Sequence, residues 1–203
     1  MPPVRHFVGR EAEMAKIKRA FQPDSANQTV VLHGISGIGK TQIALAYVLQ
    51  NLDAYSAIFW LDASDEDRLA CSFLEMADRI IKDHDSLSAL QKIVYSHNAT
   101  AAIPAIKEWL SLPGNDRWLL VYDCYEVDGI VDADDPSELC GLRKFLPDIR
   151  QGHILITTTI PGVNLGTEVA VGKLHNTEQS LDILSQASER PDLRRGKWRK
   201  VRK

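Results

Sequence analysis

The chain reads GISGIGKT over residues 34–41, directly after the apolar residues 30–32 and directly before QIALAY over residues 42–47. This order of strand, glycine-rich turn and helix, with the pattern G-x-x-x-x-G-K-[ST] at the turn, is typical of a phosphate-binding loop. Glycines allow backbone N–H groups to surround a phosphate, and the helix N-terminus adds partial positive charge. We therefore predict that Lys40 contacts the outer phosphates and that the Thr41 hydroxyl is a ligand of Mg²⁺. The simpler alternative is a glycine-rich turn that binds nothing.

Length and composition fit one well-buried globular domain. The chain has 203 residues, of which 44% are hydrophobic and 25% are charged. No apolar stretch is long enough to cross a bilayer, and the first residues lack the apolar segment of a signal peptide. These features predict a cytoplasmic protein without a membrane contact. Cys71, Cys124 and Cys140 form no C-x-x-C pair and the six histidines are scattered, so neither a disulfide framework nor a zinc site is predicted.

Charge is distributed unevenly along the chain. The net charge is -3, but residues 192–203 alone contribute +6, so the preceding residues carry -9. An acidic body argues against a nucleic-acid-binding face on the folded domain. We predict that the basic residues form a disordered tail. A nuclear-targeting or anion-binding role for this tail is the alternative.

The rest of the chain alternates between two kinds of apolar pattern. Strand patterns lie at residues 56–61, 118–123, 153–159 and 169–171, and helical patterns at 11–21, 42–51, 65–80, 99–110 and 177–187. Residues 83–97 are ambiguous, and Ser64 is predicted to cap the helix that follows it. Strands separated by helices predict an α/β fold with a mostly parallel sheet and right-handed crossovers.

The apolar strand pattern that begins at Trp118 ends in the carboxylate of Asp123. Ligands of parallel sheets bind at the carboxyl ends of the strands, so we expect Asp123 beside the phosphate loop. Its predicted role is to hold Mg²⁺, as the second acidic element of phosphate-loop NTPases does. The alternative is a carboxylate that only begins a turn. The acidic residues 128–138 are predicted to form a solvated loop.

Four blocks of sequence together resemble the nucleotide-binding part of NB-ARC proteins, which are STAND-class switch NTPases found in apoptotic regulators, plant resistance proteins and fungal NLR-like receptors. The blocks are FVGRE at 7–11, GISGIGKT at 34–41, WLLVYD at 118–123, and FLP at 145–147 with GHILITT at 152–158. The resemblance implies a three-layer P-loop NTPase fold that binds ADP or ATP with Mg²⁺ and acts in signalling through protein partners or self-association. It also implies that Val8 and Arg10 lie at the adenine.

Two positions depart from the pattern of this family. Thr159 stands where NB-ARC proteins commonly have an arginine that senses the γ-phosphate, and a threonine lacks the planar cationic fork of arginine. Cys124 stands where a second acid often follows Asp123, with Glu126 as the nearest substitute. We therefore expect slow or absent ATP hydrolysis. The chain also ends before the helical and winged-helix modules that follow in the family, which leads us to expect a truncated form.

The predicted organisation is an N-terminal segment with the adenine-site motif (1–27), a P-loop NTPase domain (28–188) and a basic tail (189–203). The expected function is an adenine-nucleotide-binding switch module. The alternatives are a truncated protein-interaction module that binds nucleotide weakly and a nucleic-acid-directed ATPase that uses the basic tail. The predicted catalytic residues are Lys40, Asp123 and Glu126, and the predicted metal ligands are Thr41 and Asp123. The predicted nucleotide contacts are Val8, Arg10, Gly34, Ile35, Ser36, Gly37, Ile38, Gly39, Lys40, Thr41 and Gln42.

Overall fold

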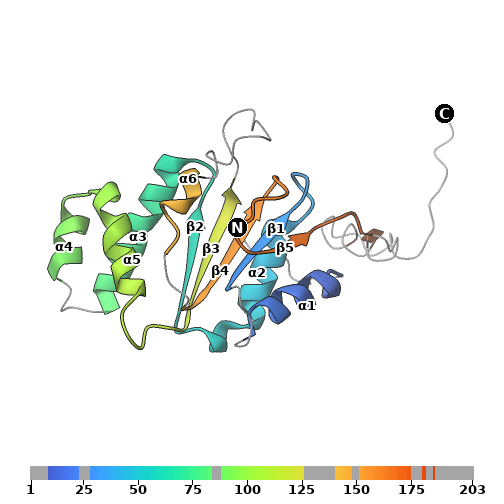
Figure 1. Cartoon of the computed structure of the whole chain (residues 1–203), viewed down its shortest axis with the longest axis horizontal. Helices are drawn as coiled ribbons and strands as arrows, with labels where there is room; N and C mark the ends of the chain where they lie inside the picture. Colours follow the sequence, from blue (N-terminus) through green and yellow to red (C-terminus); the bar gives the residue numbers. More distant parts are fainter. Residues whose placement is uncertain are drawn as a thin grey trace.

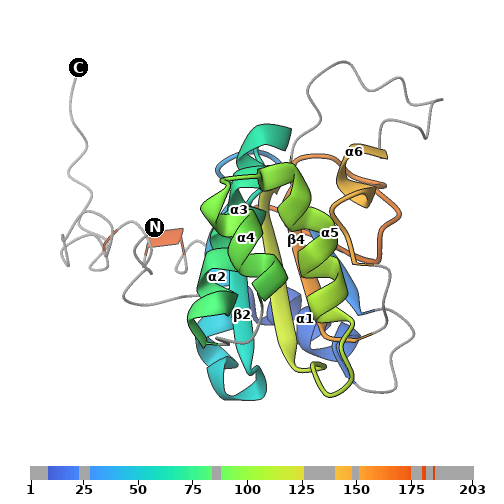
Figure 2. The ribbon, with the colours of Figure 1, turned by 90° about the vertical axis from the view of Figure 1, so that its left-hand side faces the viewer.

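The computed structural model describes residues 9–22, 28–83, 88–125, 140–147, 151–174, 180–181 and 185. In these residues a five-stranded sheet lies between helices on its two faces (Figure 1, Figure 2). The strand order is β2-β3-β4-β1-β5, and every pair of neighbouring strands is parallel. The predicted three-layer α/β fold is confirmed.

The first element of the chain is a helix. In the sequence, α3, α4 and α5 all come between β2 and β3. Their bounds are α1 (Glu11–Ala20), β1 (Thr29–His33), α2 (Lys40–Gln50), the 3₁₀ turn η1 (Leu52–Ala54), β2 (Ala57–Asp62), α3 (Glu66–Asp83), α4 (Ser88–Tyr95), α5 (Ala99–Leu110), β3 (Trp118–Tyr125), α6 (Cys140–Arg143), β4 (His153–Thr158) and β5 (Thr167–Ala170). Helix α4 occupies the segment that the sequence pattern left ambiguous. Strand β3 runs two residues further than predicted, and β4 ends one residue earlier.

The strands are buried on both faces, as is typical of a parallel sheet. Successive side chains of a strand point to opposite faces, so the strands supply two separate apolar cores. On one face, Leu32, Val121 and Leu155 pack in the core that includes residues of α1 and α2. On the other face, Leu61 and Leu120 pack in the core that includes residues of α3, α4 and α5. The two cores fix the helix layers, and thereby the position of α2 beneath the phosphate loop.

Helix α3 is capped by Asp65, so the prediction that Ser64 caps it is wrong. The Asp65 carboxylate accepts a hydrogen bond from the backbone N–H of Arg68 at 2.8 Å. Its carbonyl accepts the first helical bond, from Leu69 at 3.0 Å. Serine and aspartate are both good caps, and a hydrogen bond between Ser64 and Asp62 decides which of them caps the helix. The backbone N–H of Ser64 donates to Asp62 at 3.1 Å, which closes a turn just before the helix.

Several sequence predictions lie outside the described residues. They concern Val8, Glu126, the acidic residues 128–138 and the basic tail over 189–203. Of the helix predicted over 177–187, residues 180, 181 and 185 are described, and each of them is helical.

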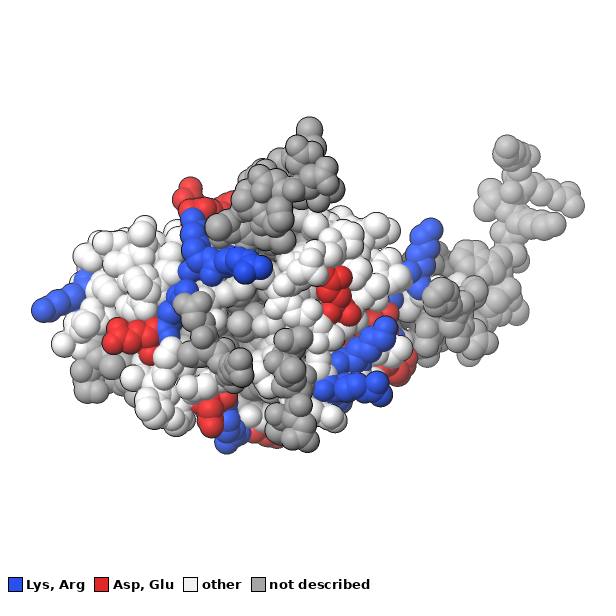
Figure 3. All heavy atoms as spheres, viewed as in Figure 1, with Lys and Arg blue, Asp and Glu red and all other residues white. Residues whose placement is uncertain are grey.

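The described surface carries charges of both signs. In the view of Figure 3, lysine and arginine side chains are interspersed with aspartate and glutamate side chains and do not gather into one basic patch. Within the described part of the chain, no helix has the length and apolar character that a membrane span requires.

Candidate functional site

The loop between β1 and α2 lies at the carboxyl end of the sheet (Figure 1). Gly37 and Gly39 have φ angles of 74° and 102°, in the left-handed region that residues with a side chain rarely adopt. At Gly34 the requirement is space, because a Cβ there would lie 2.5 Å from the backbone oxygen of Val171. All three glycines of the motif are therefore required by backbone geometry. The loop rests directly on the segment that follows β5.

Lys40 is the first residue of α2, and its side chain folds back onto the loop. Its Nζ donates to the backbone oxygens of Gly34 at 2.8 Å and Ile35 at 3.1 Å, and Lys40 is only 9% exposed. The first bond of the helix joins the N–H of Ile43 to the oxygen of Gly39. A helix leaves the amides of its first turn without intrahelical partners, and these amides lie beside the ammonium. The loop therefore concentrates positive charge and donors, which is the arrangement that binds an anion.

The other predicted phosphate contacts lie in the same segment. Ile35, Ser36 and Ile38 belong to the loop, and Gln42 lies in the first turn of α2. Ile35 is 63% exposed, so its side chain extends away from the protein and only its backbone takes part in the loop.

Thr41 and Asp123 lie 82 residues apart in the sequence and contact each other in the fold. The Thr41 hydroxyl donates to Asp123 Oδ1 at 2.9 Å, and the Thr157 hydroxyl donates to the same oxygen at 2.6 Å. Among the described residues, no hydrogen bond to Oδ2 is present. A hydroxyl and a carboxylate side by side are the hard oxygen ligands that Mg²⁺ prefers. The two predicted metal ligands therefore do come together.

Strand order explains why these residues meet. Strand β4 lies between β1 and β3, and its register pairs Leu32 with Thr157 and His33 with Thr158. The N–H of Gly34, the first residue of the loop, donates to the oxygen of Thr158 at 3.3 Å. Thr159 directly follows β4 and therefore lies beside the start of the loop. A residue that senses the γ-phosphate must lie beside the phosphate loop, so the sensor position inferred from the sequence requires this placement.

A pocket of about 490 Å³ opens beside the pair of Thr41 and Asp123. It is lined by Thr41, Leu45, Trp60, Asp62, Asp123 and Cys124. One wall is apolar, with Trp60 39% exposed. The hydrogen bond from Ser64, together with Arg68, lowers the pKa of Asp62, so this carboxyl is ionised at neutral pH. The pocket thus joins an apolar wall to carboxylates next to the candidate metal position.

Known proteins resemble this chain in sequence and in fold. No protein-family model matches the chain. A nucleotide-binding leucine-rich repeat (NLR)-like protein of Hyaloscypha variabilis is 26% identical over 163 residues, which cover 75% of this chain and 15% of that protein. A STAND protein with a tetratricopeptide repeat sensor from Pyrococcus horikoshii superposes with a TM-score of 0.52 at 23% identity, over 96% of this chain and 28% of that one. A Walker-type ATPase of Pyrococcus abyssi gives a TM-score of 0.55 at 14% identity, over 95% of this chain and 61% of that one.

The chain has the fold of these two ATPases and is similar in sequence to the NLR-like protein, and both likenesses support a P-loop NTPase domain of the NB-ARC/STAND type. The resemblance stated from the sequence is thereby confirmed. This domain corresponds to a small part of the fungal relative, because the chain spans 15% of that protein's length. The remaining length of the relative carries no information about this chain.

Arg10 makes contacts that sequence reasoning missed. Its guanidinium donates to the backbone oxygens of Gly172 at 2.7 Å and Ile38 at 3.1 Å, and it pairs with Glu13 at 2.9 Å. These bonds connect the start of α1, the phosphate loop and the segment after β5. No local pattern signals them, because Gly172 lies 162 residues further along the chain. The predicted position of Arg10 at the adenine stays a prediction.

Cys124 directly follows Asp123 and has an unusual backbone. Its φ is 63°, in the left-handed region, and the pairing of β3 with β4 shifts register between Tyr122 and Tyr125. The backbone N–H of Cys124 donates to the Thr157 hydroxyl at 2.9 Å. Its side chain is exposed and lines the pocket beside Asp123. An exposed thiol on a β-bulge thus stands at the position where the NB-ARC resemblance leads one to expect a second acid.

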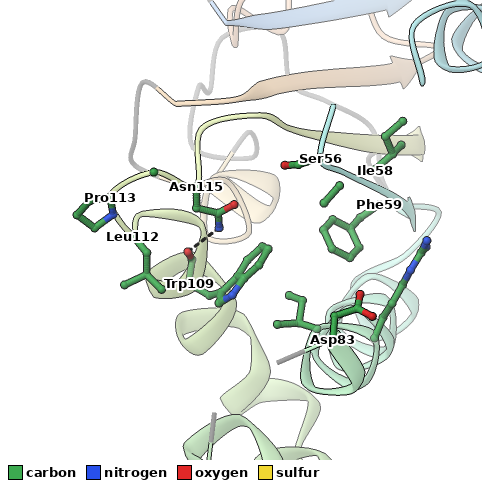
Figure 4. A pocket seen from close by; sticks show the side chains of 12 residues that line it. Ser56, Ile58, Phe59, Asp83, Trp109, Leu112, Pro113 and Asn115 are labelled. Atoms are coloured by element: carbon green, nitrogen blue, oxygen red, sulfur yellow. Dashed lines mark hydrogen bonds between the residues drawn. The ribbon is translucent and has the colours of Figure 1, made fainter. Parts of the chain in front are cut away.

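A second hollow, of about 480 Å³, lies at the amino end of β2 (Figure 4). Phe59 and Trp109 contribute its aromatic walls, with ring centroids 6.3 Å apart and planes at 87°. Helix α3 ends there at Asp83, and α5 ends nearby at Leu110. Helix carboxyl ends carry partial negative charge, which disfavours an anion. The carboxyl end of the sheet is therefore the candidate site for a phosphate.

Proposed function

We propose that this NTPase domain is an adenine-nucleotide-binding switch module of a signalling protein, and that it hydrolyses ATP slowly or not at all. The observation that carries the proposal is the contact between Thr41 and Asp123, directly beside a loop that holds the ammonium of Lys40. A glycine-rich turn without a ligand does not require this contact. The names of the NLR-like and STAND relatives support the signalling role.

The residues present fit a nucleoside phosphate with Mg²⁺. Lys40 and the backbone amides of the loop would bind the phosphates, and the closeness of Val171 to Gly34 fixes the loop in this shape. Thr41 and Asp123 would hold the metal through hard oxygen atoms. When bound, Mg²⁺ neutralises charge on the phosphates. Val8 and Arg10 are proposed to contact the base.

Slow hydrolysis follows from two side chains at this edge of the sheet. Thr159 offers the γ-phosphate a neutral hydroxyl in place of a guanidinium, and Cys124 offers no carboxylate to orient an attacking water. The γ-phosphate therefore adds little to the binding affinity of ATP relative to that of ADP. We expect ADP to bind at least as well as ATP, with turnover far below the median enzyme rate of about 10 s⁻¹. Multiple-turnover phosphate release near that rate would contradict the proposal.

The setting of the domain is also part of the proposal. We place the domain in the cytoplasm and expect the switch to act through protein partners or through self-association. The mixed charge on the face shown in Figure 3 supports a protein partner over nucleic acid. The alternative of a nucleic-acid-directed ATPase predicts salt-dependent retention on DNA that disappears when residues 192–203 are deleted.

The test combines nucleotide content with titration of ADP. Purified protein is denatured and its nucleotide separated by chromatography, and we expect ADP in an amount comparable to that of the protein. Lys40→Ala removes the charge that faces the loop without removing a core contact, so the variant should fold and lose most ADP binding. Lys18→Ala, on the exposed side of α1, is the matched control and should bind as wild type does.

Two results would count against the proposal. ADP affinity that is unchanged in a folded Lys40→Ala variant would remove the phosphate loop from the binding site. A wild-type chain that folds but shows no measurable ADP binding would favour the alternative of a protein-interaction module.

A further inference from the structure

The carboxylate of Asp123 is oriented by two hydroxyl groups, and the proposed function uses only one of them. Thr41 is the expected metal ligand. Thr157 lies on β4, is 1% exposed, and makes the shorter bond to Asp123 Oδ1, 2.6 Å against 2.9 Å for Thr41. Because Thr157 is buried, water does not compete for its hydroxyl. Its contribution to the orientation of Asp123 is therefore permanent in the folded protein.

The Thr157 hydroxyl also receives a hydrogen bond, from the backbone N–H of Cys124 at 2.9 Å. Cys124 lies where the register of β3 and β4 shifts and has a φ of 63°. A residue in a bulge falls out of the regular strand pairing, so its amide needs another acceptor. A hydroxyl has one proton and two lone pairs, so Thr157 donates to Asp123 and accepts from Cys124 at once. One side chain thus fixes both the carboxylate and the backbone that follows it.

Alternation along β3 and β4 places the Asp123 and Thr157 side chains on the same face of the sheet, the face that α2 covers. Thr157 lies on the same face as Leu155, and Asp123 on the same face as Val121. Both apolar residues belong to the core that includes residues of α2, and Thr41 lies in the first turn of that helix. The contact between the two threonines and the carboxylate is therefore set by strand order and register.

We propose that Thr157 is a positioning residue for the Mg²⁺ site, which holds the Asp123 carboxylate with Oδ1 satisfied by hydroxyls and Oδ2 directed to the ligand side. The inference rests on the proposed function, since it assigns a role toward Mg²⁺. Partners that orient a metal ligand commonly affect metal affinity by about 10- to 100-fold. Loss of the Thr157 hydroxyl should therefore weaken the contribution of Mg²⁺ to nucleotide binding and leave metal-free binding unchanged.

The experiment measures the affinity for a fluorescent ADP analogue with Mg²⁺ and with EDTA, on the full chain. The ratio of the two affinities is the Mg²⁺ gain. Thr157→Val keeps the shape of the side chain without its hydroxyl, and we expect the gain to fall by about tenfold. Thr157→Ala is measured beside it, so that the result does not depend on one variant folding. Thr157→Ser restores the hydroxyl and should restore the gain.

Two further variants separate positioning from a merely structural role. Thr158→Val is the matched control, because Thr158 is also fully buried but its hydroxyl accepts from the N–H of Ile160 and not from the site. It should keep the wild-type gain. In an Asp123→Asn background, Thr157→Val should have no additional effect on the gain, because the carboxylate it orients is gone.

The outcomes distinguish failure of this inference from failure of the proposed function. If wild type gains affinity from Mg²⁺ and the folded hydroxyl-free variants gain equally, Thr157 is structural and the inference is wrong. If Thr157→Val lowers the gain equally in the Asp123→Asn background, the residue does not act through Asp123, and the inference is also wrong. If wild type binds no ADP under either condition, the proposed function itself fails.

Discussion

Polar side chains form a hydrogen-bonded network at each end of the sheet, and the two networks differ in what they leave unsatisfied. At the amino end, the Tyr47 and Tyr55 hydroxyls lie 2.8 Å apart, and Tyr55 lies 2.8 Å from His153 Nδ1. Phe21 stacks on His153 with ring centroids 4.3 Å apart. Burial raises the pKa of both tyrosines and lowers that of His153 to about 4, so every member is neutral at pH 7.

At the carboxyl end, the corresponding network contains charges and has bonding capacity to spare. The Asp123 carboxylate receives two hydroxyl bonds on one oxygen. Among the residues that the structure describes, the Lys40 ammonium donates only to backbone oxygens of the glycine-rich loop. The amino-end network holds α2 to the sheet, and its polar groups bond to one another without a ligand. A polar cluster is therefore a candidate binding site when its charges have no ion-pair partner among the described residues, and not simply because it is polar.

The largest effect should come from Gly34→Ala, which displaces the phosphate loop at the carboxyl end of the sheet. The new Cβ would lie 2.5 Å from the oxygen of Val171, so the loop must move away from the segment after β5. We expect ADP binding to be lost and the free energy of unfolding to fall by about 1–3 kcal/mol. Calorimetric titration and thermal unfolding measure the two effects.

Gly114→Ala is the control for this prediction. Gly114 also has a positive φ, 82°, but a Cβ there would meet nothing within 4 Å. The variant carries the backbone strain alone and should bind ADP as wild type does. Wild-type affinity in Gly34→Ala would show that contact with Val171 does not set the shape of the loop.

A smaller effect is expected from Thr159→Arg, which adds a cation to the carboxyl end. A guanidinium at this position would pair with the γ-phosphate, which ADP lacks, and such a charged hydrogen bond contributes roughly 1.5–3 kcal/mol. The ratio of ATP to ADP affinity should therefore rise by about 10- to 100-fold. The ratio is measured with Mg²⁺ in one buffer. Thr100→Arg, on the exposed side of α5, adds the same charge elsewhere and should leave the ratio unchanged.

An unchanged ratio in Thr159→Arg would mean that Thr159 does not occupy the sensor position. A raised ratio would mean that the carboxyl end lacks only one cation to favour the triphosphate.

Features that depend on contiguous residues could be read from the sequence. The phosphate loop is one, because its glycines, its lysine and the start of α2 lie within eight residues. Asp123 could be placed because a strand that ends in a carboxylate delivers it to the ligand edge of a parallel sheet. The cap of α3 could not, because Ser64 and Asp65 are both good caps and the turn closed by Asp62 decides between them.

Features that depend on strand order and on bulges could not be read in this way. Thr157 reaches Asp123 only because β4 pairs with β3, and the sequence does not state that order. The bulge at Cys124, which gives Thr157 its second bond, has no signal such as a glycine. Arg10 was assigned to the base by resemblance, whereas its contacts to Ile38 and Gly172 come from tertiary structure.

The smallest effect is expected at the amino end, where acid should weaken the fold through His153. Burial lowers the pKa of this imidazole to about 4, while an imidazole in an unfolded chain titrates near 6.5. Between these values the unfolded chain binds a proton that the folded chain does not bind. Stability is therefore complete above about pH 6.5 and is lost as the pH falls toward 4. Asp62 acts in a separate range, because its lowered pKa matters only below its ordinary value of 3.8.

We expect the His153 contribution to be about 1–2 kcal/mol, less than the full pKa shift implies, because the ring is partly solvated. The measurement is the free energy of urea unfolding between pH 7 and 5 for wild type and His153→Gln. Glutamine keeps a polar group near Tyr55 and does not titrate, so the variant should lose most of the pH dependence. Its ADP affinity at pH 7 should stay that of wild type, because His153 lies at the opposite end of β4 from Thr157. An equal pH slope in both proteins would mean that His153 does not carry the effect, and a change in ADP affinity would mean that the two ends of the sheet are coupled.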